Sequence, residues 1–225
     1  MRTIVAGGIV AAAVLLLAGC ASASPGTGSA APDASDAPPA PTASAGLDVL
    51  TGPEQRARLA DLPMPSAAGE VIAIGTALQN PDGPAMLCYV VATSLPPQCA
   101  GPELVGWDWA AVPHEEASGV RWSDAAVALR ATYDATAFAI TPLEVLDLAA
   151  LSMPQRPAPT GDLDQATQTA VQEDLWSLQR PDVLGGGGDG AGIAIIEVVH
   201  DDGSMQAFLD DIYGPGAVAV VPWLL

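Results

Sequence analysis

The residues with the clearest capacity for chemistry lie in one short stretch, Trp107-Asp108-Trp109. If this stretch is a strand, alternate residues share a face, so both indoles point one way and the Asp108 carboxylate points the other. Two indoles on one face form a candidate platform for a sugar or a peptide, and a carboxylate beside them could serve a glycosidase. The alternative is that both indoles fill the core and Asp108 is merely exposed. No second acid is fixed by the sequence, so we assign no catalytic residue.

The two histidines offer little for catalysis. No Gly-x-Ser-x-Gly elbow accompanies His114 or His200, as a Ser-His-Asp hydrolase of that type would require. His114-Glu115-Glu116 lacks the second histidine of a zinc protease, so a solvent-exposed loop explains it. His200-Asp201-Asp202 could offer oxygen ligands to calcium but lacks the spaced acids of an EF-hand, and a turn before a helix capped by Ser204 is the alternative. The sequence therefore predicts no metal site and no cofactor.

Charge composition excludes several further classes of function. The chain has 225 residues, 26 of them acidic and 7 basic, for a formal net charge of -19. Every basic residue is an arginine. The absence of lysine excludes Schiff-base chemistry, a Walker lysine and a Ser-x-x-Lys nucleophile. An acidic surface also argues against nucleic acid as a partner and against electrostatic docking to anionic lipid.

A glycine run at 185–190, interrupted by Asp189, could suggest a phosphate-binding loop. Such loops follow a strand and carry a Gly-Lys-Ser or Gly-Lys-Thr sequence, and neither feature is evident here. The sequence therefore predicts a flexible loop at this position.

The first twenty residues have the pattern of an export signal. Arg2 supplies a positive charge, residues 4–18 are apolar, and Leu17-Ala18-Gly19-Cys20 follows. This pattern resembles a bacterial lipoprotein signal with its lipobox. The resemblance implies that Cys20 is acylated, that it becomes the first mature residue, and that its acyl chains bind the lipid bilayer on the extracytoplasmic face. The alternative is an uncleaved anchor with an incidental cysteine.

Residues 21–46 contain Ala, Pro, Ser, Thr, Gly and Asp and no large apolar side chain. Such a composition cannot bury enough surface to offset the entropy of ordering, so we predict a disordered stalk. At about 3.1 Å per residue for an extended Pro-rich chain, it could lift the rest of the protein well away from a membrane.

Cys88 and Cys99 lie on either side of Pro96-Pro97. Proline ends strands, so the chain could turn there and bring the two cysteines together. An exported domain favours a disulfide between them. Two unpaired buried cysteines and a metal site are the alternatives, although no close pair of metal ligands is present.

Hydrophobic patterning predicts an α+β protein with a small disulfide-linked β-barrel or sandwich, and an OB-like barrel is the preferred form. Its β-rich domain spans 47–142, beginning with a short helix at 55–62. Helices and a Gly-rich linker are predicted over 143–192, and a β-α-β segment over 193–225. The expected strands are 70–78, 87–92, 104–109, 120–122, 125–133, 136–141, 193–199 and 217–221. The expected later helices are 143–151, 162–178 and the segment that begins at Ser204.

Two stretches resemble uncharacterised secreted or lipid-anchored proteins of high-GC Gram-positive bacteria. They are 88–109, with its PPQCAGP and GWDW, and 201–218, which reads DDGSMQAFLDDIYGPGAV. The resemblance implies no activity. We therefore expect a membrane-anchored envelope lipoprotein that acts as a non-catalytic binding or scaffold module, with a cell-wall component or an envelope protein as ligand. A cell-wall-active hydrolase that uses carboxylates and a weak divalent-cation binder are the alternatives.

Overall fold

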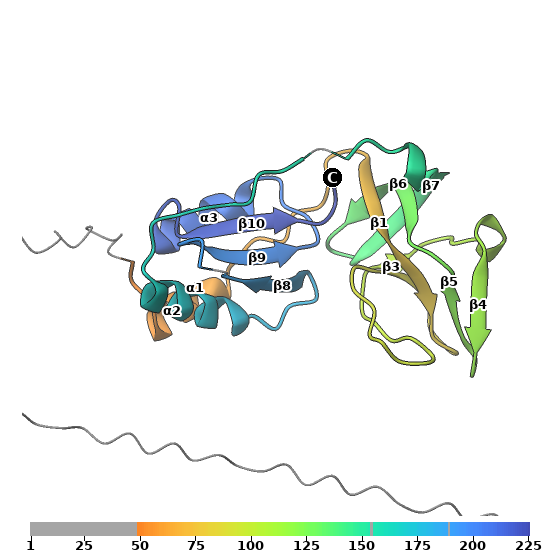
Figure 1. Cartoon of the computed structure of the whole chain (residues 1–225), viewed down its shortest axis with the longest axis horizontal. Coiled ribbons are helices and arrows are strands. Elements are labelled where there is room, and N and C mark those ends of the chain that lie inside the picture. Colours follow the sequence, from red (N-terminus) through yellow and green to blue (C-terminus); the bar gives the residue numbers. More distant parts are fainter. Residues whose placement is uncertain (1–48, 154, 189) are drawn as a thin grey trace, which may run out of the picture. The chain divides into compact units, whose positions relative to one another are not determined.

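The computed structural model describes residues 49–153, 155–188 and 190–225 (Figure 1). The signal predicted for 1–20, including Cys20, and the stalk predicted for 21–46 lie outside the described residues. The described residues form two large hydrophobic cores, one inside a β-barrel and one between a three-stranded sheet and its helices, and a smaller cluster around Leu78, Cys88 and Val120. No helix in the described ranges is long and apolar enough to cross a membrane.

The barrel is a closed ring of five strands. Its hydrogen-bonded order is β1-β2-β3-β7-β6, with β6 returning to β1, and only the β3–β7 pair is parallel. This is the strand order of an OB fold, a five-stranded Greek-key barrel, and it confirms the predicted fold class. The strands are β1 (Val71–Gln79), β2 (Ala85–Cys88), β3 (Glu103–Leu104), β6 (Val127–Asp134) and β7 (Ala139–Leu146).

The hairpin between β6 and β7 forms without a glycine at its turn. The Asp134 carboxylate accepts hydrogen bonds from the amides of Thr136 and Ala137, at 2.8 and 3.2 Å. Phe138 adopts the left-handed conformation, with φ of 49°. An Asp side chain that satisfies the following amides replaces the glycine that tight hairpins normally use.

A second hairpin is inserted between β3 and β6. It consists of β4 (His114–Ala117) and β5 (Val120–Ser123), and β5 also pairs with the end of β1. The strand over 120–122 was predicted, but the exposed loop predicted at His114-Glu115-Glu116 is wrong. These residues form a strand because the backbone of β5 supplies their partners, while their side chains remain exposed.

The predicted disulfide is confirmed: Cys88 and Cys99 are bonded, with their Cα atoms 6.0 Å apart. The predicted strand 87–92 is shorter than expected, since β2 ends at Cys88. Beyond it only an isolated bridge between Ala92 and Gln98 holds the loop across its width. The disulfide therefore closes the base of a loop that has little regular structure of its own.

The predicted helix over 143–151 is wrong. β7 continues as a strand to Leu146, and only a 3-10 turn, η2 (Leu148–Ala150), follows it. Pairing with β6 outweighs the local helix-start signal, and Arg130 reinforces the pairing through an ion pair with Glu144 of 2.6 Å. Pro142 is tolerated because the register shifts beside it, where a ladder donor is not required.

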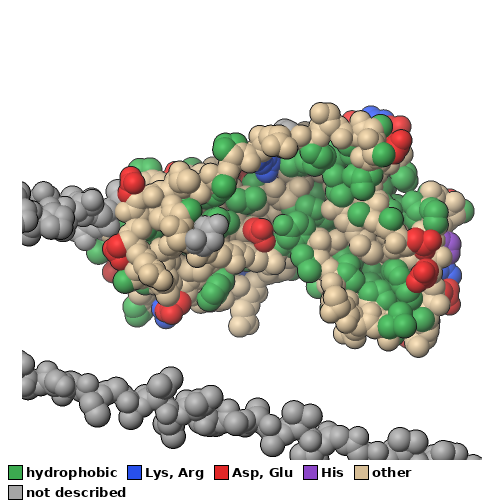
Figure 2. Space-filling model, in the orientation of Figure 1, with side chains coloured by type: hydrophobic (Ala, Val, Ile, Leu, Met, Phe, Trp, Pro, Cys, Tyr) green, Lys and Arg blue, Asp and Glu red, His purple; other side chains and the backbone are tan. Residues whose placement is uncertain are grey.

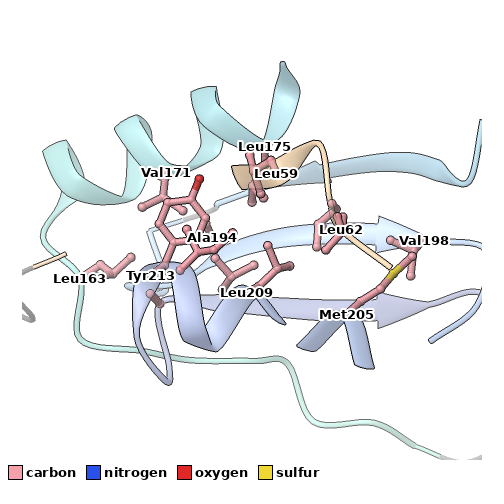
Figure 3. Packing of buried hydrophobic residues seen from close by; sticks show 14 residues of the cluster. Leu59, Leu62, Leu163, Val171, Leu175, Ala194, Val198, Met205, Leu209 and Tyr213 are labelled. Carbon is pink, nitrogen blue, oxygen red and sulfur yellow. The ribbon is translucent and has the colours of Figure 1, made fainter. Parts of the chain in front are cut away.

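The second region is a three-stranded sheet of order β10-β9-β8. The β9–α3–β10 unit has the predicted parallel β-α-β arrangement, and β8 pairs antiparallel to β9. Side chains from α1, α2, α3 and β9 point into one core (Figure 3). The elements are α1 (Pro53–Leu59), α2 (Gln165–Trp176), α3 (Ser204–Tyr213), β8 (Val183–Gly187), β9 (Ala194–Val198) and β10 (Val218–Pro222).

Acidic residues cap the later helices. The Asp164 carboxylate accepts from the amides of Ala166 and Thr167 at the start of α2. At α3 the predicted Ser204 cap is wrong, because Gly203 occupies the cap position. The Asp201 carboxylate instead accepts from the amide of Met205 at 2.9 Å and satisfies a donor that the helix leaves free.

Two Arg–Asp pairs hold the α1 segment against the second region. The fully buried Asp174 accepts from Arg56 Nε at 2.5 Å and from the Gly52 amide at 3.0 Å. Arg180 pairs with the buried Asp182 at 2.7 Å and also donates to the carbonyls of Leu62 and Pro63. The region predicted as β-rich, 47–142, thus begins with a helix that packs into the core of the second region.

The last described residues return to the barrel. Ile72 and Leu225 exchange two backbone hydrogen bonds, of 2.7 and 3.0 Å, and Trp223 Nε1 donates to the carbonyl of Ile74. Val199 and Leu224 are buried in the barrel core rather than in the core beside β9. Each core therefore contains residues from both ends of the described chain.

Candidate functional site

The predicted Trp107-Asp108-Trp109 strand is wrong. β3 ends at Leu104, Gly106 turns the chain with φ of 70°, and Trp109 begins the 3-10 helix η1 (Trp109–Ala111). The two indoles nevertheless contact each other edge to face, with ring centroids 5.8 Å apart. They meet because of a turn and not because they alternate along a strand.

These indoles brace the barrel. Both are partly buried and pack against its core, and Trp109 Nε1 donates to Gln79 Oε1 at 2.8 Å. Trp107 Nε1 is buried without a hydrogen-bond partner. The Asp108 carboxylate accepts from the Ala110 amide at 2.9 Å and caps η1. The arrangement matches the core-packing interpretation better than an open platform.

The other residues considered for chemistry do not come together in one site either. Within the described ranges, no three His, Cys, Asp or Glu side chains lie close enough together to hold a metal ion. His200 lies beside Tyr133, with ring centroids 6.1 Å apart, and burial lowers the pKa of the imidazole against the opposing effect of Asp202 and Asp201. Burial also raises the pKa of Tyr133 to about 12, with Asp182 adding to the effect. The lowered pKa keeps the His200 imidazole uncharged near neutral pH, and its Nδ1 is buried without a hydrogen-bond partner among the described residues.

A hollow on the described surface lies between α2 and the glycine run. We call this hollow the α2–β8 cleft. Its volume is about 320 Å³, which is the size of a small ligand site. Its described lining consists of Gln165, Gln168, Thr169, Gln172, Trp176, Gly187, Gly188 and Gly190.

The α2 side of the cleft follows from helical spacing. Gln165, Thr169, Gln172 and Trp176 recur at intervals of four, three and four residues, so they form one stripe along the helix. The Asp164 cap fixes where the helix begins and hence where the stripe starts. Hydrogen bonds from Thr167 lower the pKa of the Asp164 carboxyl, which keeps this cap charged.

On the other side, Gly185–Gly187 belong to a strand, so the flexible loop predicted for 185–190 is wrong at these three residues, whereas Gly188 and Gly190 lie beyond the strand. β8 extends through Gly187 because β9 pairs with it. A Cβ at Gly186 would lie 2.3 Å from the carbonyl oxygen of Ile195 and 3.0 Å from Gln172 Nε2, and one at Gly188, just beyond β8, would overlap the Gln168 amide. The glutamines of α2 thus occupy the space that side chains on the glycine run would fill.

Two of the glutamines are structural parts of the cleft wall. Gln168 and Gln172 are each 5% exposed. Gln168 Nε2 donates to the carbonyl of Ile193 at 2.7 Å, and Gln172 Oε1 accepts from the amide of Ile195 at 3.2 Å. Gln172 Nε2 is buried with no hydrogen-bond partner. Because an unpartnered buried donor is costly, this amide is a donor that a bound ligand could satisfy.

Trp176 gives the cleft an apolar end, with 63% of its surface exposed. The described lining carries no ionisable side chain, although Asp164 and Glu173 flank Gln165 and Thr169 in the adjoining hollow. Acidic side chains are scattered over the visible face of the molecule, with few basic ones among them (Figure 2). The described part of the cleft lining is therefore neutral and lies in acidic surroundings.

Sequence reasoning missed this site. The available signal was the set of glutamines at positions 165, 168 and 172 of a helix that is followed by a glycine run. Neither half is informative alone, because a polar stripe usually faces solvent and a glycine run usually forms a loop. Only the tertiary structure brings the two halves together.

Two other hollows are more apolar. One, of about 280 Å³, lies beside η1 and the ends of β6 and β7. Another, of about 420 Å³, contains Tyr89 and Trp223, whose rings are 5.6 Å apart. Tyr89 donates to Glu197 at 3.3 Å, and Trp223 donates to the β1 backbone, so the polar groups of both residues already have partners.

Comparison with known proteins adds no functional information. No protein-family model, curated protein or solved structure matches this chain. The α2–β8 cleft consequently has to be judged on its own chemistry.

Proposed function

We propose that this protein is a membrane-anchored, extracytoplasmic binding module of the cell envelope, with the α2–β8 cleft as its ligand site. The observation that carries the proposal is the lining of the cleft. It consists of glutamine amides, the Thr169 hydroxyl, glycine backbone and the exposed Trp176 indole, and it includes the buried Gln172 Nε2, which has no hydrogen-bond partner. Such groups recognise an uncharged polar ligand by hydrogen bonds and apolar contact.

The same lining favours binding over catalysis. Glutamine, threonine and tryptophan side chains do not exchange protons near neutral pH, so the described wall supplies no general acid or base. The carboxylate-based hydrolase gains no support from Asp108, which serves as a helix cap.

The anchor belongs to the proposal because of the sequence at Cys20. Stable attachment to a bilayer needs more than one acyl chain, as the lipobox resemblance implies. Cys20→Ala should abolish fatty-acid labelling and leave unprocessed precursor. Normal processing and labelling of that variant would refute this part of the proposal.

The binding function is tested with the full chain in detergent micelles. It is offered to purified peptidoglycan, to an array of neutral glycans and to a random heptapeptide library displayed on phage. Thr169→Tyr places a bulky ring in the cleft from an exposed position, and Ala207→Tyr makes a matched change at an exposed position of α3. A ligand lost in the first variant and kept in the second supports the proposal. If every ligand that binds is unaffected by Thr169→Tyr, the cleft is not the site.

The same samples are assayed for turnover of peptidoglycan and of chromogenic glycosides and esters. We expect none. Turnover that disappears in Asp108→Asn would replace the binding function with a hydrolase.

A further inference from the structure

We infer that the ligand of the α2–β8 cleft is an extended peptide segment, which binds as an additional strand on the free edge of β8. This inference rests on the proposed function of the cleft and names its ligand class. It is carried by three features that coincide at one place: an unpaired sheet edge, a glycine run without shielding side chains, and a helix stripe beside both.

The first feature is the edge itself. β8 lies at the end of the order β10-β9-β8 and pairs only with β9 among the described strands. An edge strand carries peptide N–H and C=O groups on the side without a neighbour, and these groups are a template for a further strand. The closed barrel has no comparable opening in its ring.

The second feature is the lack of protection. Natural edge strands are usually guarded by lysine, proline, a charged side chain or a covering segment. β8 ends in Gly185, Gly186 and Gly187, which carry no side chains, after a register shift against β9 between Val183 and Gly185. Nothing lies within 4 Å of the position that a Cβ would take on Gly187, whereas Glu197 Oε2 lies 2.9 Å from that position on Gly185 and Ile195 O lies 2.3 Å from it on Gly186. At Gly187, therefore, no side chain hinders the approach of a second backbone.

The third feature is the matching length of the two walls. The stripe from Gln165 to Trp176 spans roughly 16 Å at 1.5 Å per helical residue. A strand of five residues spans about 17 Å. A segment of about five residues could therefore pair with β8 along its backbone and place alternate side chains against α2, as in known peptide grooves between a strand and a helix.

The lining specifies the chemistry of the peptide. Gln172 Nε2 is a donor suited to a peptide carbonyl, and Trp176 suits an apolar or aromatic side chain at one end. Asp164 and Glu173 nearby disfavour acidic side chains. The preferred segment is thus neutral or basic, with one large apolar residue.

Strand addition has a test that does not depend on knowing the natural partner. A heptapeptide selected from the phage library on the full chain is synthesised with alternate backbone amides N-methylated, in two complementary sets. In an added strand only one set of amides faces β8, so one analogue should lose affinity at least tenfold and the other should keep most of it. The amides of Gly185–Gly187 that face the peptide should exchange more slowly with solvent in the complex.

The outcomes separate the two proposals. Equal binding by both methylated analogues, or no change in amide exchange in β8, would overturn strand addition. If a neutral glycan binds through Thr169 and no peptide is enriched, strand addition fails and the binding function of the cleft stands. If Thr169→Tyr removes no ligand of any kind, both proposals fail.

Discussion

The barrel and the second region, which we call the α/β region, each enclose a hydrophobic core, but their sheets end differently. The barrel sheet closes on itself, so each of its five ring strands has a neighbour on both sides. The three-stranded sheet of the α/β region stops at β8, whose last three residues are glycines. Trp107 and Trp109 pack against the barrel core, whereas Trp176 of the α/β region is exposed. Conspicuous aromatic residues therefore need not lie on an open surface.

A core variant in each region should have the largest effect on stability, and its unfolding shows whether the two regions are independent. Leu209 on α3 and Leu129 in the barrel are both fully buried. Leu209→Ala and Leu129→Ala should each lower the free energy of unfolding by about 3–4 kcal/mol, because each leaves a cavity. Since each core contains residues from both ends of the chain, we expect one cooperative transition by far-UV circular dichroism and by tryptophan fluorescence. Two separate transitions would show that the regions are independent.

The disulfide links two residues of the barrel and none of the α/β region. Cys88→Ser with Cys99→Ser should lower the free energy of unfolding by about 3 kcal/mol, the value for constraining a loop of this size. Binding at the α2–β8 cleft should persist under conditions where the variant is folded. Urea titration, with and without a peptide that binds the cleft, measures both quantities. A folded variant that no longer binds would show that the cleft depends on the barrel.

Asp174 tests how firmly α1 belongs to the α/β region. Asp174→Ala removes the acceptor of Arg56 and of the Gly52 amide. The free energy of unfolding should fall by about 2 kcal/mol. Breaking a fully buried ion pair would lower it more, but Arg56 is half exposed and can be hydrated. Limited proteolysis should then cleave within 49–63 before any site in the barrel. Glu173→Ala, at the neighbouring exposed position, is the control and should leave this cleavage pattern unchanged.

The smallest effect is a pH dependence at His200. Burial lowers the pKa of His200 in the folded state, so the unfolded chain binds the proton more readily. Stability from this group is complete above the ordinary pKa near 6.5 and declines as the pH falls through that value toward the folded pKa. The carboxyls of Asp164 and Asp202 have lowered pKa values, so their contributions are lost only in more acidic solution.

His200→Gln should therefore flatten the dependence of the thermal midpoint on pH between 7.5 and 5. His114→Gln, which changes an exposed histidine, is the matched control. If the thermal midpoint of His200→Gln depends on pH as strongly as that of the unmodified protein, groups other than His200 cause the dependence.

Much of the fold could be predicted because local signals and tertiary structure agree. The strand predicted over 70–78, the helix predicted over 162–178 and the helix predicted from Ser204 are each present, with slightly different ends. The errors fall where pairing overrides local preference. A helix-start signal at 141–144 was absorbed into β7, and the glycine run became β8 because neighbouring strands supplied hydrogen bonds.

The candidate site was unpredictable for a related reason. The cleft exists only because glycines of one element make room for glutamines of another, at positions such as Gly188 and Gln168. No local pattern encodes that complementarity. The predicted cystine was accessible from sequence because Cys88 and Cys99 lie close together along the chain, with a proline turn between them.

The exchange of segments between the two cores also has a consequence for the timing of folding. Trp223 bonds to Ile74 across 149 positions, and α1 packs against α2 from the opposite end of the described chain. The barrel core cannot be completed while residues 223–225 are still being synthesised or translocated, because Trp223 and Leu224 belong to it. Contacts this distant in sequence are slow to form, because the intervening loop must be closed first. In a nascent chain the barrel would therefore stay open to proteases and chaperones until residues 223–225 emerge and pack against it.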